Sequence, residues 1–326
     1  MYLVKSKLKK ILSNLGLGKK NIVSKVHEEN FALHQDYPTT LDSELSEYAL
    51  KVAKRIRNSE CKPAIIIHGT MQRTGTVYVG ELIRLHPDIY AYPKEIWEIP
   101  FLRFIDVILT FQDKFFSAYK QNIGKIGKYD FLPIFGAAFI DYLYSEVPEG
   151  KQMLLKIPSV KNLNYFFGVF PYENLLLLMR DGRDVVSSTI KTWPQRDFTE
   201  VSQQWKDNAQ IALNFDHHYL QKEGYLFSKY EDIINNPIDF IQEACNKFGL
   251  DSEKFPYEKI EELPVRGSSS ASVNQQGKVS WNPVEKSENF KPTQRWDSWS
   301  EPQKNTFKKI AGEMLIKLGY TENLNW

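Results

Sequence analysis

The chain alternates short apolar runs with longer segments in which apolar residues recur every three or four positions. Residues 63–68 are a continuous apolar run rich in β-branched residues, which is typical of a strand buried on both faces of a parallel sheet. A turn follows at 69–75, and apolar residues at helical spacing then predict a helix at 76–85. The first unit is therefore predicted as strand, loop and helix.

The same order recurs along the rest of the chain. Residues 174–179 form a second strongly apolar run, which a polar loop joins to a predicted helix at 185–193. Further strands are predicted at 153–156 and 225–229, and further helices at 199–220, from about 237 to 248, and at 302–318. Strands that alternate with helices indicate a parallel sheet covered on both faces. We therefore predict a three-layer α/β fold with a central parallel sheet flanked by helices.

Two regions interrupt this alternation. Thirteen aromatic residues lie between Trp97 and Tyr144, mostly three or four positions apart, and this spacing predicts two helices. Their aromatic side chains suit either core packing or the wall of a pocket, and the sequence does not separate the two. Residues 251–300 are polar and predict one long ordered excursion, a type of loop that usually serves a ligand in a compact domain.

Composition narrows the function classes. The formal net charge is only +2, so the chain as a whole gives no reason to expect nucleic acid as a partner. Cys61 and Cys245 lie far apart and form no cluster of metal-ligand spacing, so we expect free thiols and no metal site. No apolar run reaches the roughly 20 residues that a membrane-spanning helix needs. We expect a cytoplasmic protein.

The N-terminus differs from the rest in charge. Residues 1–25 carry seven lysines and no acid, with apolar residues at helical spacing, and they lack the features of a secretory signal. Such a segment can lie on an anionic membrane surface. The alternatives are a frayed basic helix and a helix packed on its own domain. We predict a basic helical extension at 1–60 and one domain at 61–326.

A turn suited to binding phosphate follows the first predicted strand. In open parallel sheets, ligands collect at the carboxyl ends of strands, where a helix N-terminus offers unpaired N–H groups. Here Gly75 allows close backbone approach, Thr74 and Thr76 supply hydroxyls, and Arg73 after Gln72 supplies a fixed charge. The alternative is that this turn only caps a helix.

The turn departs from the Walker A pattern of nucleoside-triphosphate enzymes. Five residues separate Gly69 from Gly75, and Thr76 stands where the lysine of that pattern belongs. This weakens the rival prediction of a small-molecule kinase, which needs such a lysine and normally Mg²⁺.

A second turn of the same kind follows the apolar run at 174–179. Arg180 comes directly after the run, and Ser188 lies eight residues further on, inside the next predicted helix. The loop between them folds so that both side chains can reach one phosphate. Asp181, Arg183 and Asp184 are expected to organise the turn and cap the helix.

Over residues 63–320 the chain resembles the sulfotransferases that use 3′-phosphoadenosine 5′-phosphosulfate. The similar segments, in the family's order, are TMQRTGTVYV, LLLLMRDGRDVVSS, SKYEDIINNP, RGSSS and FKPTQRWDSWS. The last two are similar to segments of bacterial members. The resemblance implies a P-loop-like fold and assigns residues 61–326 to a sulfotransferase domain.

The resemblance also implies a set of cofactor-binding residues: Gln72, Arg73, Thr74, Gly75, Thr76, Tyr78, Arg180, Ser188, Tyr230, Arg266 and Gly267. The first turn would hold the 5′-phosphosulfate. The arginine and serine of the second turn would hold the 3′-phosphate, on which Arg266 and Gly267 would close. The two tyrosines would lie near the adenine, or else serve as ordinary core aromatics.

Two cations are expected near the transferred group. Lys156, in LLKIPS, resembles the strand-end lysine of bacterial and protein-tyrosine sulfotransferases. Arg73 stands where many cytosolic members have lysine, whereas the protein-tyrosine type carries arginine. An arginine stays charged and does not plausibly donate a proton, so charge neutralisation is its expected role. Sulfuryl transfer then needs in-line geometry and placed cations, and no metal.

A carboxylate is expected to accept the acceptor's proton. Glu95 is the first candidate, since it lies where tyrosine-sulfating members place a glutamate, and Glu98 is the reserve. His68 and His86 are poorer candidates, because one ends a buried strand and the other a helix.

The acceptor is predicted only by class: a small molecule, lipid or carbohydrate with a hydroxyl or amine group. The remaining rival is a catalytically silent nucleotide-binding protein that holds a partner through the aromatic region or the basic N-terminus. Oligomeric state leaves no signal in the sequence.

Overall fold

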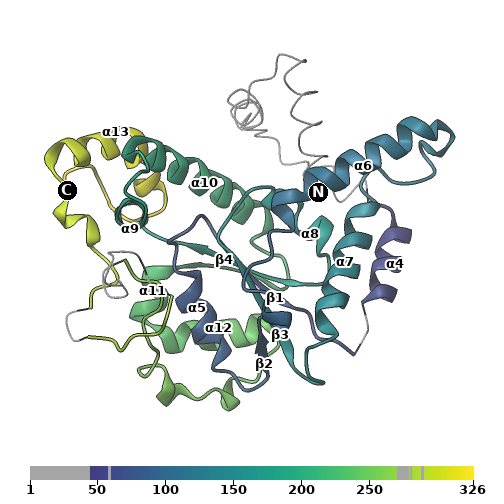
Figure 1. The fold of residues 1–326 in the computed structure, drawn as a ribbon, viewed down its shortest axis with the longest axis horizontal. Coiled ribbons are helices and arrows are strands. Elements are labelled where there is room, and N and C mark those ends of the chain that lie inside the picture. The colour runs from purple at the N-terminus through teal and green to yellow at the C-terminus, as the bar shows by residue number, and fades with distance from the viewer. Residues whose placement is uncertain (1–44, 58–59, 270–278, 280, 288–289) are drawn as a thin grey trace, which may run out of the picture. The chain divides into compact units, whose positions relative to one another are not determined.

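A parallel β-sheet forms the centre of the computed structural model, which describes residues 45–57, 60–269, 279, 281–287 and 290–326. The strand order is β2-β3-β1-β4-β5, and every pair of neighbours runs parallel (Figure 1). The strands are β1 (Ile65–Gly69), β2 (Ile89–Ala91), β3 (Gln152–Ile157), β4 (Asn174–Met179) and β5 (Tyr225–Lys229).

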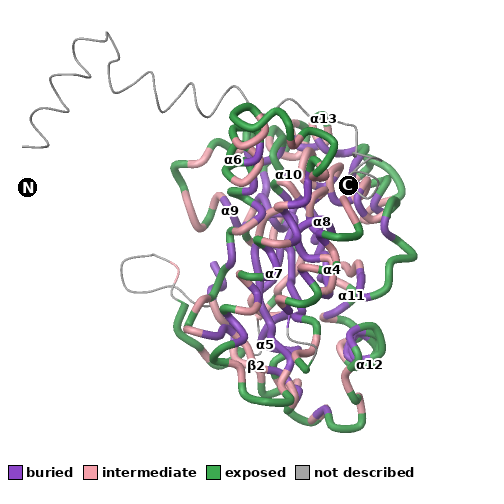
Figure 2. The backbone as a smooth tube through the Cα atoms, turned by 90° about the vertical axis from the view of Figure 1, so that its right-hand side faces the viewer, coloured by how far each residue is buried: buried purple, intermediate pink, exposed green. Residues whose placement is uncertain are grey.

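The three central strands are buried along their whole length (Figure 2). This burial explains their continuous apolar runs, because each lies between two other strands and under helices on both faces. Ile67 of β1 pairs with Lys156 on one side and with Leu176 on the other. The loops that follow these strands therefore leave the sheet at one edge.

One face of the sheet is covered by α5 (Thr76–Arg84), α11 (Tyr230–Asn235) and α12 (Pro237–Phe248). Alternate strand residues, such as Ile65 and Ile67, point to this face and pack with Leu82 of α5 and Phe240 of α12 in one buried cluster. Because side chains alternate along each strand, the remaining residues of the strands point to the opposite face of the sheet, which is also apolar.

The opposite face is covered by α7 (Phe131–Tyr144), α8 (Phe166–Val169) and α10 (Phe198–Tyr219) (Figure 1). His68 of β1 meets the ring of Phe166 edge-on, and Phe167 stacks on Phe215. Two more helices, α9 (Gly182–Thr192) and α13 (Glu301–Lys317), pack against α10. The predicted three-layer α/β fold is confirmed.

The described part of the N-terminal region is one helix, α4 (Glu47–Ile56), which packs on α7. Just after it, Arg57 forms a buried ion pair of 2.7 Å with Glu173. The described residues just before the predicted boundary at residue 60 thus pack against the domain that follows it. The predicted basic helix at 1–25 lies outside the described residues. Over those that are described, no helix is long and apolar enough to cross a membrane.

The two interrupting regions have distinct structures. The aromatic segment contains α6 (Ile105–Ala118) and α7, the two helices that its spacing predicts. The described parts of the polar excursion contain short 3₁₀ turns, among them Ser252–Lys254, Tyr257–Lys259 and Arg295–Ser298, and a backbone bridge between Val265 and Val284. This excursion returns to the carboxyl edge of the sheet.

Candidate active site

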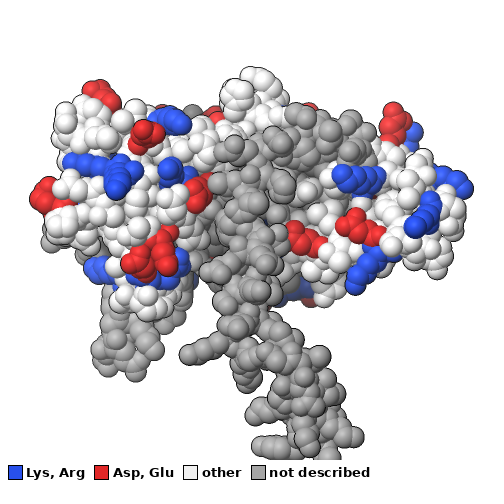
Figure 3. Space-filling model, turned by 90° about the horizontal axis from the view of Figure 1, so that it is seen from above, with Lys and Arg blue, Asp and Glu red and all other residues white. Residues whose placement is uncertain are grey.

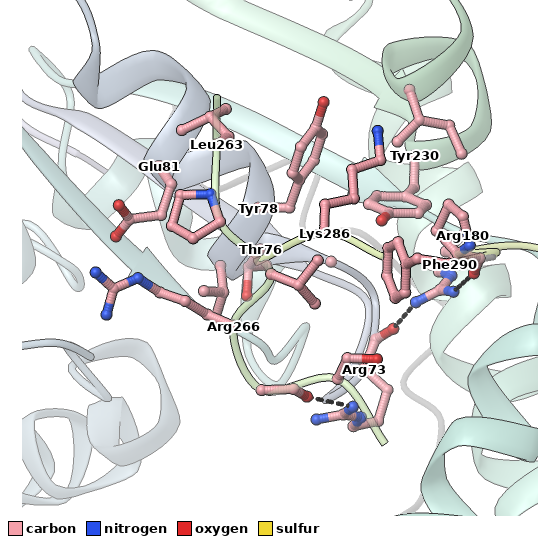
Figure 4. Close-up of a pocket in the computed structure, with 18 of the residues that line it drawn as sticks. Arg73, Thr76, Tyr78, Glu81, Arg180, Tyr230, Leu263, Arg266, Lys286 and Phe290 are labelled. Carbon is pink, nitrogen blue, oxygen red and sulfur yellow. Dashed lines mark hydrogen bonds between the residues drawn. The ribbon is translucent and has the colours of Figure 1, made fainter. Parts of the chain in front are cut away.

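A cavity of about 590 Å³ opens at the carboxyl edge of the sheet. Its walls include the turn after β1, Arg180 after β4, the end of β3 and parts of the excursion between 260 and 295 (Figure 4). The cavity therefore lies where the sequence predicts a ligand site, at the ends of neighbouring parallel strands.

The turn after β1 is shaped by a glycine and a buried threonine. Gly75 has φ +105°, and a Cβ added there would meet the ring of Tyr230, so this position requires glycine. Thr74 is fully buried, and its hydroxyl bonds to both the N–H and the carbonyl of Met71. Thr74 therefore stabilises the turn and does not line the cavity, whereas Thr76 does.

The turns after β1 and β4 are bonded to each other. Arg180 donates from one guanidinium nitrogen to the backbone carbonyl of Arg73, over 2.7 Å. Arg73 in turn donates through Nε to the hydroxyl of Ser188, 2.9 Å away, and through its terminal nitrogen to the carbonyl of Gly267, 2.7 Å away. Ser188 is buried behind Arg73 and does not itself line the cavity. The two predicted turns thus face one cavity.

Arg180 is fixed from several sides. Its guanidinium lies over the ring of Tyr230, 4.5 Å from the ring centre, and donates to the carbonyl of Pro292 in the excursion. Its own carbonyl accepts from the indole of Trp205, 3.2 Å away. Burial raises the pKa of the nearby Glu231 carboxyl to about 7, although the charge of Arg180 acts in the opposite direction.

The excursion brings a third arginine, Arg295, to the cavity. Its guanidinium nitrogens lie 3.1 Å from the hydroxyl of Ser269 and 3.3 Å from that of Ser268. Its backbone N–H donates over 2.6 Å to Asp184 of α9, which also accepts from the N–H of Gln294. The segment FKPTQRWDSWS, which resembles the family, contains Arg295, but the sequence alone did not single out this arginine as a cofactor-binding residue.

The three arginines lie close enough to repel one another. Burial, with the charges of Arg180 and Arg295, lowers the pKa of Arg73 to about 10. Burial and Arg180 likewise lower the pKa of Arg295 to about 10. Clustered like charges of this kind are costly unless an anion compensates them.

Several of these donors lack a partner. Within the described residues, the Nε atoms of Arg180, Arg266 and Arg295 are buried and make no hydrogen bond. Buried donors without partners are rare in proteins and call for an explanation. A dianion bound beside Arg180 and Arg295 would meet this need there, because phosphate oxygens accept several hydrogen bonds and compensate positive charge.

A lysine–glutamate pair lies at the end of β3, on the other side of β1 from β4. Lys156, at the end of β3, is almost fully buried and lies 3.0 Å from the Oε1 of Glu98. Both residues line the cavity, and Glu95 does not. Glu95 is exposed and has φ +57°, in a turn where Tyr92 and Lys94 also have positive φ. The structure thus brings the reserve candidate, and not the first one, beside Lys156.

Both histidines are engaged elsewhere. The Nδ1 of His68 lies 2.8 Å from the carbonyl of Ser159, and burial lowers the pKa of His68 to about 4. His86 accepts from the N–H of Asp88 and donates to the carbonyl of Asp251, 2.9 Å away. Neither histidine lines the cavity.

A third part of the cavity wall is apolar. Tyr78 meets Tyr230 edge-on with ring centres 5.9 Å apart, and Leu263 and Phe290 lie nearby (Figure 4). Arg266, which was expected to approach the second turn, instead points toward Glu81, on the side of the cavity away from Arg180 (Figure 4). Its neighbour Gly267 does approach the first turn, since its carbonyl accepts a hydrogen bond from Arg73.

Most of the predicted site residues therefore share one cavity. Those that line it are Gln72, Arg73, Gly75, Thr76, Tyr78, Lys156, Arg180, Tyr230, Arg266 and Gly267. Thr74 and Ser188 lie behind its wall, and Glu95 lies outside it. In the part of the chain that the structure describes, no group of three or more His, Cys, Asp or Glu side chains is placed to hold a metal ion.

None of the curated proteins matches the chain in sequence. Similar solved structures include the sulfotransferase domain from the curacin biosynthetic pathway, with 16% identity and a TM-score of 0.48 over 78% of this chain and 98% of that one. They also include mouse sulfotransferase SULT7A1 complexed with PAP, with 11% identity and a TM-score of 0.45 over 84% and 90% of the chains. Sulfotransferase STF9 from Mycobacterium avium has 13% identity and a TM-score of 0.45 over 87% and 84%.

The family assignment rests on the sequence profile of the sulfotransferase family. This profile matches residues 63–254, which is more than half of the 326 residues and includes both strand-end turns and Lys156. The resemblance found in the separate motifs is thereby confirmed. The chain belongs to the sulfotransferase family.

Proposed function

We propose that this sulfotransferase moves the sulfuryl group of 3′-phosphoadenosine 5′-phosphosulfate to a hydroxyl or amine of an acceptor, by metal-free in-line transfer. The observation that carries the proposal is the bonding between Arg73 and the second strand-end turn at one cavity. A nucleotide with phosphates at both ends of its ribose has the two anionic groups that such a pair of turns is suited to hold.

The donor set fits this nucleotide. The buried Nε atoms without partners on Arg180 and Arg295, with the hydroxyls of Ser268 and Ser269 beside Arg295, suit the 3′-phosphate. The N–H groups at the start of α5 and the charge of Arg73 suit the 5′-phosphosulfate. The apolar wall beside Tyr78 and Tyr230 suits the adenine.

The bound nucleotide supplies the sulfuryl group, and the protein supplies position and charge. Arg73 and Lys156 neutralise the charge that builds on the departing phosphate, because both are cations at the cavity wall. Arg73 reaches that phosphate by exchanging its bond to the carbonyl of Gly267, a neutral acceptor, for a charged one.

Glu98 is the proposed base. The amine of Lys156 donates to its Oε1, and this bond holds the carboxylate at the cavity wall, which both residues line. Glu98 then takes the acceptor's proton as the acceptor oxygen or nitrogen attacks sulfur. Glu95 is set aside for this role, since its side chain lies outside the cavity.

The acceptor must approach Glu98 and Lys156, because these residues are the proposed base and one of the two proposed cations. A small molecule, a lipid or a carbohydrate with one free hydroxyl or amine meets this requirement. We propose the acceptor only at this level of class.

The test is transfer of radiolabelled sulfate from the donor to a library of hydroxyl and amine acceptors. The wild type is expected to label a subset of them, whereas Glu98→Gln should lose a factor of about 10² to 10⁴ in turnover. Glu95→Gln is the matched control and should stay within a few-fold of the wild type. Full turnover by Glu98→Gln, or loss of turnover only in Glu95→Gln, would remove Glu98 from the mechanism.

A further inference from the structure

Exposed apolar side chains gather on one projecting segment of the domain. The described residues include fourteen large hydrophobic residues that are exposed, and five of them lie within twenty positions. These five are Phe104, Val107, Phe111, Tyr119 and Ile123. We call residues 103–128, which contain α6 and the loop after it, the α6 arm. Outside functional sites, contiguous apolar surface of this kind is uncommon on soluble proteins.

Helical spacing places these side chains together. Phe104, Phe111, Phe115 and Tyr119 follow one another at intervals of seven, four and four positions, so they share one face of the helix. Phe111 and Phe115 touch Phe131 of α7 at the inner edge of this face. Over half of the Phe111 side chain nevertheless stays exposed, so α7 covers the apolar face only in part.

The α6 arm is also the basic part of this region. It contains Arg103, Lys114, Lys120, Lys125 and Lys128 but only two acids, a net charge of +3 against +2 for the whole chain. One of the two acids, Asp106, lies 3.3 Å from the amine of Lys161, which lies outside the arm. The cations stand before, within and after the apolar stretch, so a negatively charged partner complements it.

The shape of the arm favours a planar partner. In Figure 1, α6 extends beyond the neighbouring helices α4 and α7, so its outer side is convex. At that end of the molecule, Figure 3 shows Lys and Arg side chains, with some Asp and Glu side chains between them, among uncharged surface. A partner protein that receives a helix normally offers a groove for it, whereas a bilayer surface accepts a convex helix with an apolar face and flanking cations.

We propose that the α6 arm docks on the surface of a lipid bilayer that carries anionic headgroups. Its exposed apolar side chains enter the boundary between headgroups and acyl chains, and its lysines contact the headgroups. Charge argues against two other occupants. A second copy of the arm would bring together two segments of +3, and residues 1–25 of the same chain carry seven lysines and no acid.

The test is co-sedimentation of the full chain with vesicles of phosphatidylcholine alone or mixed with phosphatidylglycerol. The arm variant carries Phe104→Gln, Val107→Gln and Ile123→Gln, three exposed apolar residues of the arm. The matched control carries Tyr48→Gln, Leu220→Gln and Ile238→Gln, which are also exposed apolar residues but lie outside the arm. A third variant carries Lys114→Gln, Lys120→Gln and Lys125→Gln, and melting curves verify that all variants fold.

The wild type and the control are expected to bind the anionic vesicles, more weakly at high salt. The arm variant and the lysine variant should each lose roughly tenfold or more in partition coefficient. Equal binding by all four proteins would overturn the proposal, and so would binding that is lost only when the lysines of residues 1–25 are replaced. Absence of vesicle binding, with a dimer in light scattering that the arm variant abolishes, would assign the face to a second copy and overturn it as well.

Discussion

At the scale of single residues, the site depends on how arginines are held. Arg73 has a backbone φ of +74°, a conformation that costs energy for a residue with a side chain and tends to occur at functional sites. In this conformation the carbonyl of Arg73 accepts a hydrogen bond from Arg180, and the side chain of Arg73 donates to the hydroxyl of Ser188. Arg73 belongs to the turn after β1, but its hydrogen bonds connect that turn to Arg180 and Ser188, which follow β4.

Arg295 is predicted to bind phosphate. Replacing it with alanine removes a charged donor beside Arg180 and should weaken binding of adenosine 3′,5′-bisphosphate by about 1.5–3 kcal/mol. Isothermal titration calorimetry measures this loss. The matched control is Arg196→Ala, because Arg196 bonds to Gln204 and does not line the cavity. Equal affinity in both variants would exclude Arg295 from the phosphate site.

Glu231 is predicted to make stability depend on pH. Burial raises its pKa from an ordinary 4.5 to about 7, so between these values the folded state holds a proton that the unfolded state has lost. The free energy of unfolding therefore falls as pH rises through this window, by at most about 3 kcal/mol for this group. Glu231→Gln cannot titrate and should lack this part of the loss.

Urea unfolding of the wild type and Glu231→Gln at pH 5, 6 and 7 measures the effect. Glutamine retains an oxygen that can accept from the N–H of Asp181, as Glu231 does in the wild type. The two stability curves should diverge as pH rises, with the variant becoming relatively more stable. Parallel curves would contradict the raised pKa.

The choice between Glu95 and Glu98 shows what a sequence leaves open at this scale. Both glutamates stand the right distance after the first turn, and nothing local separates them. Three residues with positive φ, Tyr92, Lys94 and Glu95, decide it, because the chain turns there and carries Glu98 to Lys156. Such conformations in residues other than glycine leave no clear mark in the sequence.

At the scale of elements, the turn after β1 depends on Gly75. Alanine at this position would combine a positive φ with a clash against the ring of Tyr230. Gly75→Ala should destabilise the fold by more than the 1–2 kcal/mol or so that a left-handed residue alone costs, and should also weaken binding of the bisphosphate.

Gly124→Ala is the matched control for that prediction. Gly124 also has a positive φ, +80°, but a Cβ there would meet nothing within 4 Å. Chemical unfolding should therefore show only the backbone cost in this variant, with nucleotide affinity unchanged. Equal destabilisation by the two substitutions would mean that Tyr230 does not pack tightly against the turn.

The main elements followed from the sequence because burial imposes a pattern on them. The central strands β1 and β4 are continuous apolar runs, since both of their faces are covered. The shorter elements did not follow. β2 has three residues, and α11 has six and begins directly at the end of β5. Both are too short to show the spacing of apolar residues that marks a strand or a helix.

At the scale of the whole molecule, the site depends on which loops the sheet brings together at the carboxyl ends of its strands. Parallel pairing gathers the loops after β1, β3 and β4 at one edge, and this juxtaposition was predictable from the order of strands and helices. The return of residues 260–295 across the cavity was not, because it depends on bonds such as that between Asp184 and the N–H of Arg295. Hydrogen bonds between residues so far apart in the chain produce no repeating pattern in the sequence from which they could be predicted.

The most direct test of the proposed site measures whether Arg180, after β4, binds a 3′-phosphate. Calorimetry compares adenosine 3′,5′-bisphosphate with adenosine 5′-monophosphate, in the wild type and in Arg180→Ala. The wild type should prefer the bisphosphate by at least about 1.5–3 kcal/mol, and Arg180→Ala should lose most of that preference. A wild type that binds both nucleotides equally, or an Arg180→Ala variant that keeps the full preference, would contradict the proposed site.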